Sequence, residues 1–255
     1  MQASVGSHCV DCARAARPDV ATRVKFASSR VLTPVTYTII AINVLVFLWM
    51  GVKDPKSFGG GITQAHANLG LSRNILKYGV AYTDGSHDPT HQWYRLVTNE
   101  FIHFGFFHIG MNMLLLFQLG NLLERALGGK KLALMYFASL LAGSLGVIVV
   151  NTPGITGGAS GAIFGLMAGA AVGLHRRGVN IFSTGIGTTL VLNLVLTFTI
   201  SGISIGGHIG GGIGGAICGW VMLAPGWKPV PKWATWATPI AVAVLSVAAS
   251  IIIVG

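Results

Sequence analysis

The sequence predicts an all-α membrane protein that crosses the bilayer seven times. Of its 255 residues, 52% are hydrophobic and only 9% are charged, and the mean hydropathy is +0.68, which is too apolar for one soluble domain. Seven apolar segments are long enough, at about 20 residues each, to cross a hydrocarbon core of about 30 Å as helices. They lie near 35–52, 106–123, 132–150, 160–175, 180–200, 203–224 and 236–254.

The positive charges predict the orientation of these spans. A net charge of +10 would suggest nucleic acid as a partner of a soluble protein, but here the Lys and Arg residues follow the topology. With the N-terminus in the cytoplasm, every short inside loop is basic and every short outside loop lacks Lys and Arg, as the positive-inside rule requires. The five remaining cations lie in one long outside loop: Lys53, Lys56, Arg73, Lys77 and Arg95. We expect a multi-pass protein of the bacterial plasma membrane and no nucleic acid partner.

Three regions follow in chain order. Residues 1–30 form a basic cytoplasmic tail, residues 31–225 a six-helix core with the long outside loop 53–105, and residues 226–255 an additional C-terminal transmembrane helix. The first apolar run begins after about 30 polar and basic residues without a small-residue cleavage site, which indicates a retained helix and no removed leader.

The tail contains an incomplete metal motif, His8-Cys9-Val10-Asp11-Cys12. Thiolate and imidazole are good zinc ligands, but a structural zinc site needs four ligands and no second Cys pair follows. A weak zinc site, a remnant of a larger metal-binding module and a basic tail that touches anionic lipid all remain open.

Polar residues in the first, second and fifth spans mostly have structural interpretations. Asn43 is expected to bond a neighbouring helix, and Glu124 to fix helix ends. Trp93 and Tyr94 suit a loop that lies partly in the bilayer surface. The fifth span carries Ser183, Thr184 and Asn193, and nothing in it points to catalysis; the seventh span is a plain apolar packing helix.

The stretch 157–165, Gly-Gly-Ala-Ser-Gly-Ala-Ile-Phe-Gly, is the centre of the prediction. It places Ser160 at the start of an uncharged helix with glycine at every fourth position, a pattern typical of tight helix contact in lipid. A second glycine ladder, Gly207, Gly211, Gly215 and Gly219, begins beside His208. Two such faces in contact would bring Ser160 and His208 within hydrogen-bond distance, and this is the pair that a hydrolase needs.

Helical rise places three polar residues at one depth. His108 lies 16 residues before Glu124, Ser160 lies 16 before Arg176, and His208 lies 17 before Pro225. At a rise of about 1.5 Å per residue, each lies about 24–26 Å from the inner end of its span. Asn112 follows His108 by one turn on the same helix face. We therefore expect a polar site near the outer surface.

The residue types in this site suggest acyl transfer. Ser160 would be the nucleophile and His208 the general base, while the N–H groups at the helix start, His108 and Asn112 would stabilise an oxyanion. The nearest acidic residues lie in loops, so we expect a Ser–His dyad without a carboxylate. Phe164, one turn after Ser160, would pack on the imidazole.

The chain resembles the rhomboid family of intramembrane serine proteases over residues 35–225. The resemblance is carried by Trp93-Tyr94-Arg95, His103, His108-xxx-Asn112, Gly120-xxx-Glu124-xxx-Gly128, Gly158-Ala159-Ser160-Gly161 and Gly207-His208-Ile209-Gly210-Gly211. It implies a six-helix rhomboid-like bundle plus one extra C-terminal helix, no metal or cofactor, and cleavage of single-pass membrane proteins within or beside their transmembrane segment.

Residue by residue, the resemblance assigns roles in the site. It makes Ser160 the nucleophile, His208 the base, and the Ser160 N–H, His108 and Asn112 the oxyanion hole, with Gly158 on the substrate-binding side. Some relatives have Tyr where this chain has Phe164. The resemblance further implies that the loop 151–157 lines the approach of the substrate, and that the fifth helix or the loop 201–206 is a lateral gate.

Two other classes of protein fit some of the same residues. A transporter or channel would use His108, Asn112 and His208 as a polar path, with Ser160 as a packing residue. A membrane cytochrome would use His103, His108 or His208 as axial haem ligands. An inactive relative that only binds membrane proteins is a third possibility, against which the intact Ser160 and His208 argue.

Overall fold

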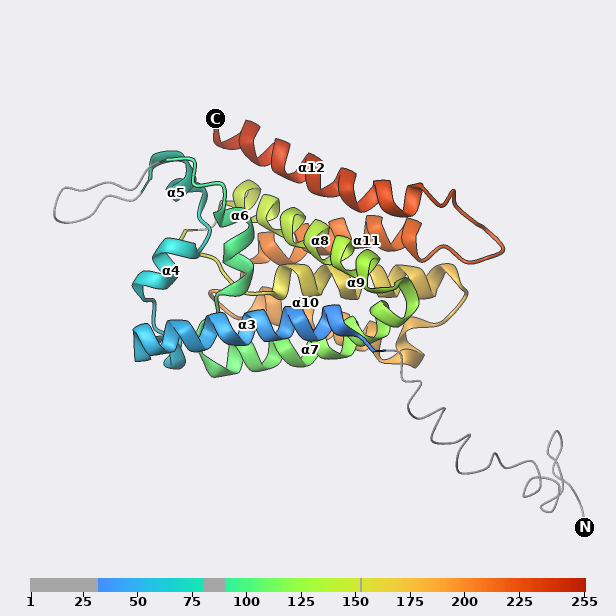
Figure 1. Cartoon of the computed structure of the whole chain (residues 1–255), viewed down its shortest axis with the longest axis horizontal. Coiled ribbons are helices and arrows are strands. Elements are labelled where there is room, and N and C mark those ends of the chain that lie inside the picture. The colour runs from blue at the N-terminus through green and yellow to red at the C-terminus, as the bar shows by residue number, and fades with distance from the viewer. Residues whose placement is uncertain (1–31, 80–89, 152) are drawn as a thin grey trace, which may run out of the picture. The chain divides into compact units, whose positions relative to one another are not determined.

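The computed structural model describes residues 32–79, 90–151 and 153–255, and the regular secondary structure in these ranges is helical (Figure 1). The predicted tail 1–30, with His8, Cys9 and Cys12, lies outside the described residues. The long helices are α3 (Pro34–Lys53), α7 (Gly105–Leu127), α8 (Gly129–Val150), α9 (Ser160–Arg176), α10 (Ile186–Thr199), α11 (Ile205–Met222) and α12 (Ala234–Val254). The short ones are η1 (Pro55–Gly59), α4 (Gln64–Leu69), α5 (Arg73–Tyr78), α6 (Arg95–Thr98), η2 (Asn99–Phe101) and η3 (Ile181–Thr184).

Each apolar range that the sequence predicts to cross the bilayer contains one long helix. Four of these helices, α3, α7, α8 and α12, are long and apolar enough to cross a membrane. The other three are shorter or less apolar: α9 has 17 residues, α10 has 14, and eight of the 18 residues of α11 are glycines. The expected single helix over 180–200 is wrong, because Gly185, at φ 77°, ends η3 and precedes α10.

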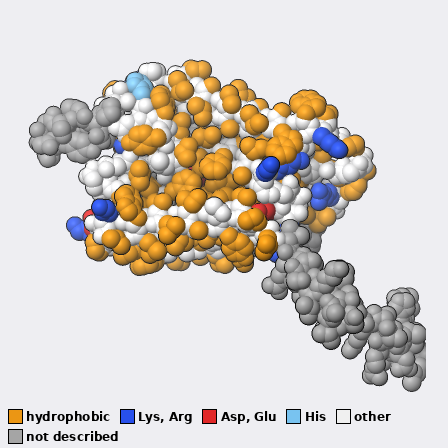
Figure 2. Space-filling view, viewed as in Figure 1, with side chains coloured by type: hydrophobic (Ala, Val, Ile, Leu, Met, Phe, Trp, Pro, Cys, Tyr) orange, Lys and Arg blue, Asp and Glu red, His pale blue; other side chains and the backbone are white. Residues whose placement is uncertain are grey.

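The surface of the helical unit 33–255 fits a membrane protein. Large apolar side chains such as Leu45, Phe107 and Ile252 are exposed on several helices. Figure 2 shows hydrophobic side chains over the middle of one face and Lys and Arg side chains toward its two ends. Such a continuous exposed apolar surface is not tolerated in water and is typical of contact with lipid.

The helix α9 packs against α8 and α11 with little space between backbones. A Cβ atom at Gly211 would lie 2.0 Å from the Gly161 carbonyl oxygen, and one at Gly215 would lie 2.0 Å from the Gly165 oxygen. The two glycine ladders therefore face each other, as the sequence predicts. This contact sets the distance between the N-terminal ends of α9 and α11.

The segment between α3 and α7 is held in place by buried polar groups. Arg95 is fully buried and donates hydrogen bonds to Gln92 Oε1 at 2.7 Å, to the Ala67 carbonyl at 2.6 Å and to the Gly70 carbonyl at 2.8 Å. A β-bridge pairs Leu71 with Thr156, just before α9. The long loop thereby fixes the chain that leads into Ser160.

Glu124 joins α7 to the start of α3. Its carboxylate accepts hydrogen bonds from the backbone N–H groups of Val35 and Thr36, at 3.0 and 2.8 Å, and from the Thr36 hydroxyl at 2.6 Å. A carboxylate at a helix N-terminus satisfies N–H groups that have no partner within the helix. Glu124 thus fixes a helix end, as the sequence predicts.

Candidate active site

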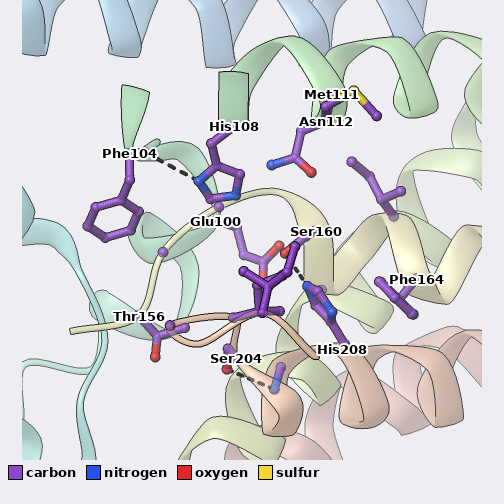
Figure 3. A pocket seen from close by; sticks show the side chains of 18 of the residues that line it. Glu100, Phe104, His108, Met111, Asn112, Thr156, Ser160, Phe164, Ser204 and His208 are labelled. Carbon is purple, nitrogen blue, oxygen red and sulfur yellow. Dashed lines mark hydrogen bonds between the residues drawn. The ribbon is translucent and has the colours of Figure 1, made fainter. Parts of the chain in front are cut away.

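Ser160 and His208 lie in direct contact at the N-terminal ends of two helices. Ser160 is the first residue of α9 and His208 lies in the first turn of α11. The distance between His208 Nε2 and Ser160 Oγ is 2.7 Å, and Figure 3 shows this bond at the wall of a pocket. The tight glycine contact between α9 and α11 explains how residues 48 positions apart in the sequence come this close.

The His208 ring is held on its other faces as well. Phe164 stacks on it, with ring centroids 4.1 Å apart and planes inclined by 19°. This is the packing expected for a residue one turn after Ser160. His208 Nδ1 lies 2.7 Å from Thr197 Oγ1 on α10, a neighbour that the sequence does not reveal. Both ring nitrogens therefore have protein partners.

His108 and Asn112 face the same pocket from α7 (Figure 3). His108 Nδ1 accepts a hydrogen bond from the Phe104 N–H at 3.3 Å, which leaves Nε2 as the protonated nitrogen. Asn112 Nδ2 is buried and has no partner among the described residues. Two N–H donors on one helix face thus line the pocket that Ser160 also lines, which is the kind of group an oxyanion site requires.

Gly158 allows these donors to approach the chain before Ser160. Its φ is 123°, a conformation that L-residues rarely adopt, and a Cβ atom there would lie 2.7 Å from His108 Nε2. Its N–H donates to the Asn99 carbonyl at 2.8 Å. The next residue is held by the buried His103, which accepts a hydrogen bond from the Ala159 N–H at 3.5 Å. Burial lowers the pKa of His103 to about 3. A neutral His103 thus supports the turn.

One acidic residue of the long outside loop reaches the pocket, which was not expected from the sequence at this depth. Glu100 in η2 lines the pocket and is only 3% exposed, because the short helix turns its carboxyl group inward. Its Oε2 accepts a hydrogen bond from the Ala162 N–H at 3.3 Å and so caps α9, whose own N-cap residue Ala159 provides no side-chain cap. Burial raises the pKa of Glu100 from 4.5 to about 8, so the group is largely protonated at neutral pH.

This raised pKa predicts a specific pH dependence. Below about pH 4.5 Glu100 is protonated in both states, and as the pH rises toward 8 only the unfolded chain loses the proton. The contribution of Glu100 to the free energy of unfolding therefore falls over this window. In Glu100→Gln, where the amide oxygen can still cap α9, this fall is absent, and thermal unfolding in detergent micelles at pH 5, 6, 7 and 8 measures the difference.

A surface acid provides the control for this experiment. Asp54 accepts a hydrogen bond from the Lys56 N–H at an exposed turn, so Asp54→Asn is expected to keep the pH dependence of the wild type. A stability difference between wild type and Glu100→Gln that is constant across these four pH values would contradict the raised pKa.

The pocket has a volume of about 390 Å³ and joins these groups. Its lining comes from α7, α8, α9, α10 and α11, from η2 and Phe104, and from the segments 155–158 and 200–204. Apolar residues and glycines make up most of the lining, and Ser160, His208, His108 and Asn112 share it. This combination is typical of a site that binds an apolar chain and acts on one polar bond.

Comparison with known proteins gives the same family as the sequence motifs. The Rhomboid domain model matches residues 90–225, which include Ser160, His208, His108 and Asn112. Rhomboid protease GluP from Bacillus subtilis is 30% identical over 160 residues, and the putative rhomboid protease YdcA from the same organism is 29% identical over 136 residues. The inactive RHOMBOID-like protein 8 of Arabidopsis thaliana is 29% identical over 126 residues.

These matches cover 63%, 53% and 49% of this chain, respectively. They cover 28% of GluP, 60% of YdcA and 35% of the inactive protein, so the chain spans only part of the length of these relatives. The domain match extends over more than half of the chain and confirms the resemblance seen in the motifs. The chain belongs to the rhomboid family.

Proposed function

We propose that the chain is an intramembrane serine endopeptidase that cleaves peptide bonds in or next to the transmembrane segments of membrane proteins. The observation that carries this proposal is the 2.7 Å contact between Ser160 Oγ and His208 Nε2 at the wall of a largely apolar pocket. The family supports it, since GluP is named a rhomboid protease. Because the similar RHOMBOID-like protein 8 is named inactive, the proteolytic activity of this chain has to be tested by experiment.

In the first step of the proposed reaction, His208 Nε2 takes the proton of the Ser160 hydroxyl as the oxygen attacks the carbonyl carbon of the scissile bond. The carbonyl oxygen becomes an oxyanion. The Ser160 N–H is one of the helix N–H groups without an intrahelical partner, and His108 Nε2–H and Asn112 Nδ2–H lie on the facing helix. These three donors would bind the oxyanion.

In the second step, the protonated His208 gives its proton to the nitrogen of the scissile bond, and the bond breaks. The new amino terminus leaves and the acyl group stays on Ser160 Oγ. Water then attacks this ester with His208 again as the base, and the carboxyl product and the free serine are released. No metal or cofactor enters this reaction.

The proposed membrane arrangement has seven spans, six in the core 31–225 and one in the additional region 226–255. Its orientation places the N-terminus in the cytoplasm and Ser160 toward the outside. The basic residues between the spans support this orientation, among them Lys130 and Lys131 in the first turn of α8, and Lys228 and Lys232 before α12. The proposed orientation of the helices across the bilayer rests on these charges.

Single-pass membrane proteins are the proposed substrates. The pocket is bordered by α10 and by residues 200–204, and α10 is mostly exposed or half-buried, with Gly187 and Thr197 as its buried residues. A weakly packed helix beside the pocket would let a transmembrane segment enter laterally from the bilayer. This is the gate that the family resemblance implies.

The test is cleavage by the full chain in proteoliposomes, with a panel of tagged single-span proteins read by gel shift. We expect at least one product whose new terminus lies in or beside the span. A fluorophosphonate should label the wild type at Ser160 and label His208→Ala only slowly. A folded protein that neither cleaves nor reacts would overturn the protease, and ion flux through the same vesicles would then favour the channel.

A further inference from the structure

Thr197 is the buried polar residue of an otherwise poorly buried helix. Along α10, Gly187 and Thr197 are the buried positions, and Thr197 is only 1% exposed. A hydroxyl that is removed from both water and lipid needs hydrogen-bond partners, because an unmet polar group in an apolar environment is costly. Those partners identify what Thr197 does.

The Thr197 hydroxyl takes part in two hydrogen bonds. Its oxygen lies 2.6 Å from the Asn193 carbonyl oxygen on the preceding turn and 2.7 Å from His208 Nδ1. The hydroxyl has one proton, and a carbonyl oxygen can only accept. The proton of Thr197 must therefore point to Asn193, and the Thr197 oxygen must accept the hydrogen bond from His208.

This direction fixes the tautomer of His208. If Thr197 Oγ1 accepts, Nδ1 carries the proton and Nε2 has the free electron pair. Nε2 is the nitrogen that lies 2.7 Å from Ser160 Oγ. The other tautomer would put a proton on Nε2, and His208 could then not accept the proton of the serine.

We propose that Thr197 is a positioning residue of the proposed protease, which holds His208 in the tautomer that acts as a base. The expected effect on kcat rests on the proposed function, whereas the tautomer of His208 follows from the hydrogen bonds of Thr197 alone. During the reaction His208 becomes positively charged. The two linked hydrogen bonds, from His208 Nδ1–H to Thr197 Oγ1 and from the Thr197 hydroxyl to the Asn193 carbonyl oxygen, then direct the partial negative charges of both oxygens toward the imidazolium. The hydroxyl thereby takes the orienting place of an acid without adding a buried charge.

The sharpest variant is Thr197→Val, which keeps the shape of the side chain and removes the hydroxyl. We expect kcat to fall about 10- to 100-fold, because one neutral hydrogen bond is removed. This is less than the loss of about 10⁴-fold that a wrong histidine tautomer causes in serine proteases with a buried acid. KM should stay within about 2-fold, since Thr197 lies behind His208 and the substrate meets Ser160 first. Thr197→Ser retains the hydroxyl and should restore kcat to within about 3-fold of the wild type.

A matched control lies two residues away. Thr199 is exposed, and its hydroxyl donates to the Val195 carbonyl at 2.8 Å, which repeats the local bond of Thr197 without a histidine. Thr199→Val should therefore behave as the wild type. An equal loss in both Val variants would mean that the hydroxyls act only on the stability of α10, and it would overturn the proposal.

The second readout is independent of cleavage. Imidazole 15N chemical shifts of the full chain in micelles distinguish the two neutral tautomers, with assignment through His208→Ala. We expect the Nδ1–H form in the wild type and in Thr197→Ser, and a mixture of tautomers in Thr197→Val. An Nε2–H form in the wild type would overturn the inference, even if the Val variant failed to fold. If the wild type cleaves nothing but shows the Nδ1–H form, the proposed function fails and the positioning by Thr197 stands.

Discussion

Replacing Ser160 by Ala is expected to abolish cleavage and to leave the fold intact. The substitution removes one oxygen at the first position of α9, where Ala is compatible with the helix, and it leaves the glycine contacts with α11 unchanged. The attacking atom is lost, and loss of the nucleophile in a serine protease lowers kcat by a factor on the order of 10⁶. Single-turnover cleavage in proteoliposomes measures this effect, and thermal unfolding in micelles tests the fold.

A buried serine outside the pocket provides the control. Ser139 on α8 donates its hydroxyl to the Met135 carbonyl at 2.8 Å and does not line the pocket, so Ser139→Ala should cleave at the wild-type rate. If Ser160→Ala retained more than about a tenth of the activity, where a lost nucleophile predicts a loss on the order of 10⁶-fold, Ser160 would be a packing residue, as in the transporter or channel.

The long helices could be predicted because their signal is local. An apolar run of about 20 residues and a glycine at every fourth position are properties of one segment, and they predicted the seven long helices of the described residues and the contact between α9 and α11. The division of 180–200 was missed because a glycine at positive φ looks in the sequence like the other glycines of this chain. Whether Gly185 ends a helix depends on how η3 packs.

The candidate site was predicted in part for a related reason. Ser160, His208, His108 and Asn112 lie on predicted helices, so helical rise places the first three at one depth, and helical pitch places Asn112 on the face of His108. Glu100 and Thr197 were missed because their positions depend on tertiary structure. Glu100 reaches the pocket through a short turn in a long loop, and Thr197 is one of several Thr residues on α10, which only helix packing distinguishes.

Replacing Gly215 by Ala is expected to cost about 3 kcal/mol or more of the free energy of unfolding. The added methyl group would lie 2.0 Å from the Gly165 carbonyl oxygen and 2.3 Å from two other backbone atoms of the same residue. Because backbone in the middle of a helix cannot rotate away as a side chain can, α11 must move off α9, and overpacking of this kind costs about 1–3 kcal/mol even where side chains can adjust. Thermal unfolding in micelles measures the loss.

For Gly212, a neighbouring glycine of the same helix, the change to Ala is expected to raise the free energy of unfolding. Apart from the backbone of α11 itself and its chain neighbours, a Cβ atom at Gly212 would have no atom within 4 Å, so Gly212→Ala adds no clash and gains about 0.5–1 kcal/mol in helix propensity. The movement of α11 in Gly215→Ala would also pull His208 from Ser160, so its cleavage should fall even well below the unfolding temperature, whereas Gly212→Ala should cleave normally. Equal unfolding temperatures for the two variants would mean that the glycine ladders of α9 and α11 do not face each other, and the 2.7 Å contact of the dyad would lose its physical basis.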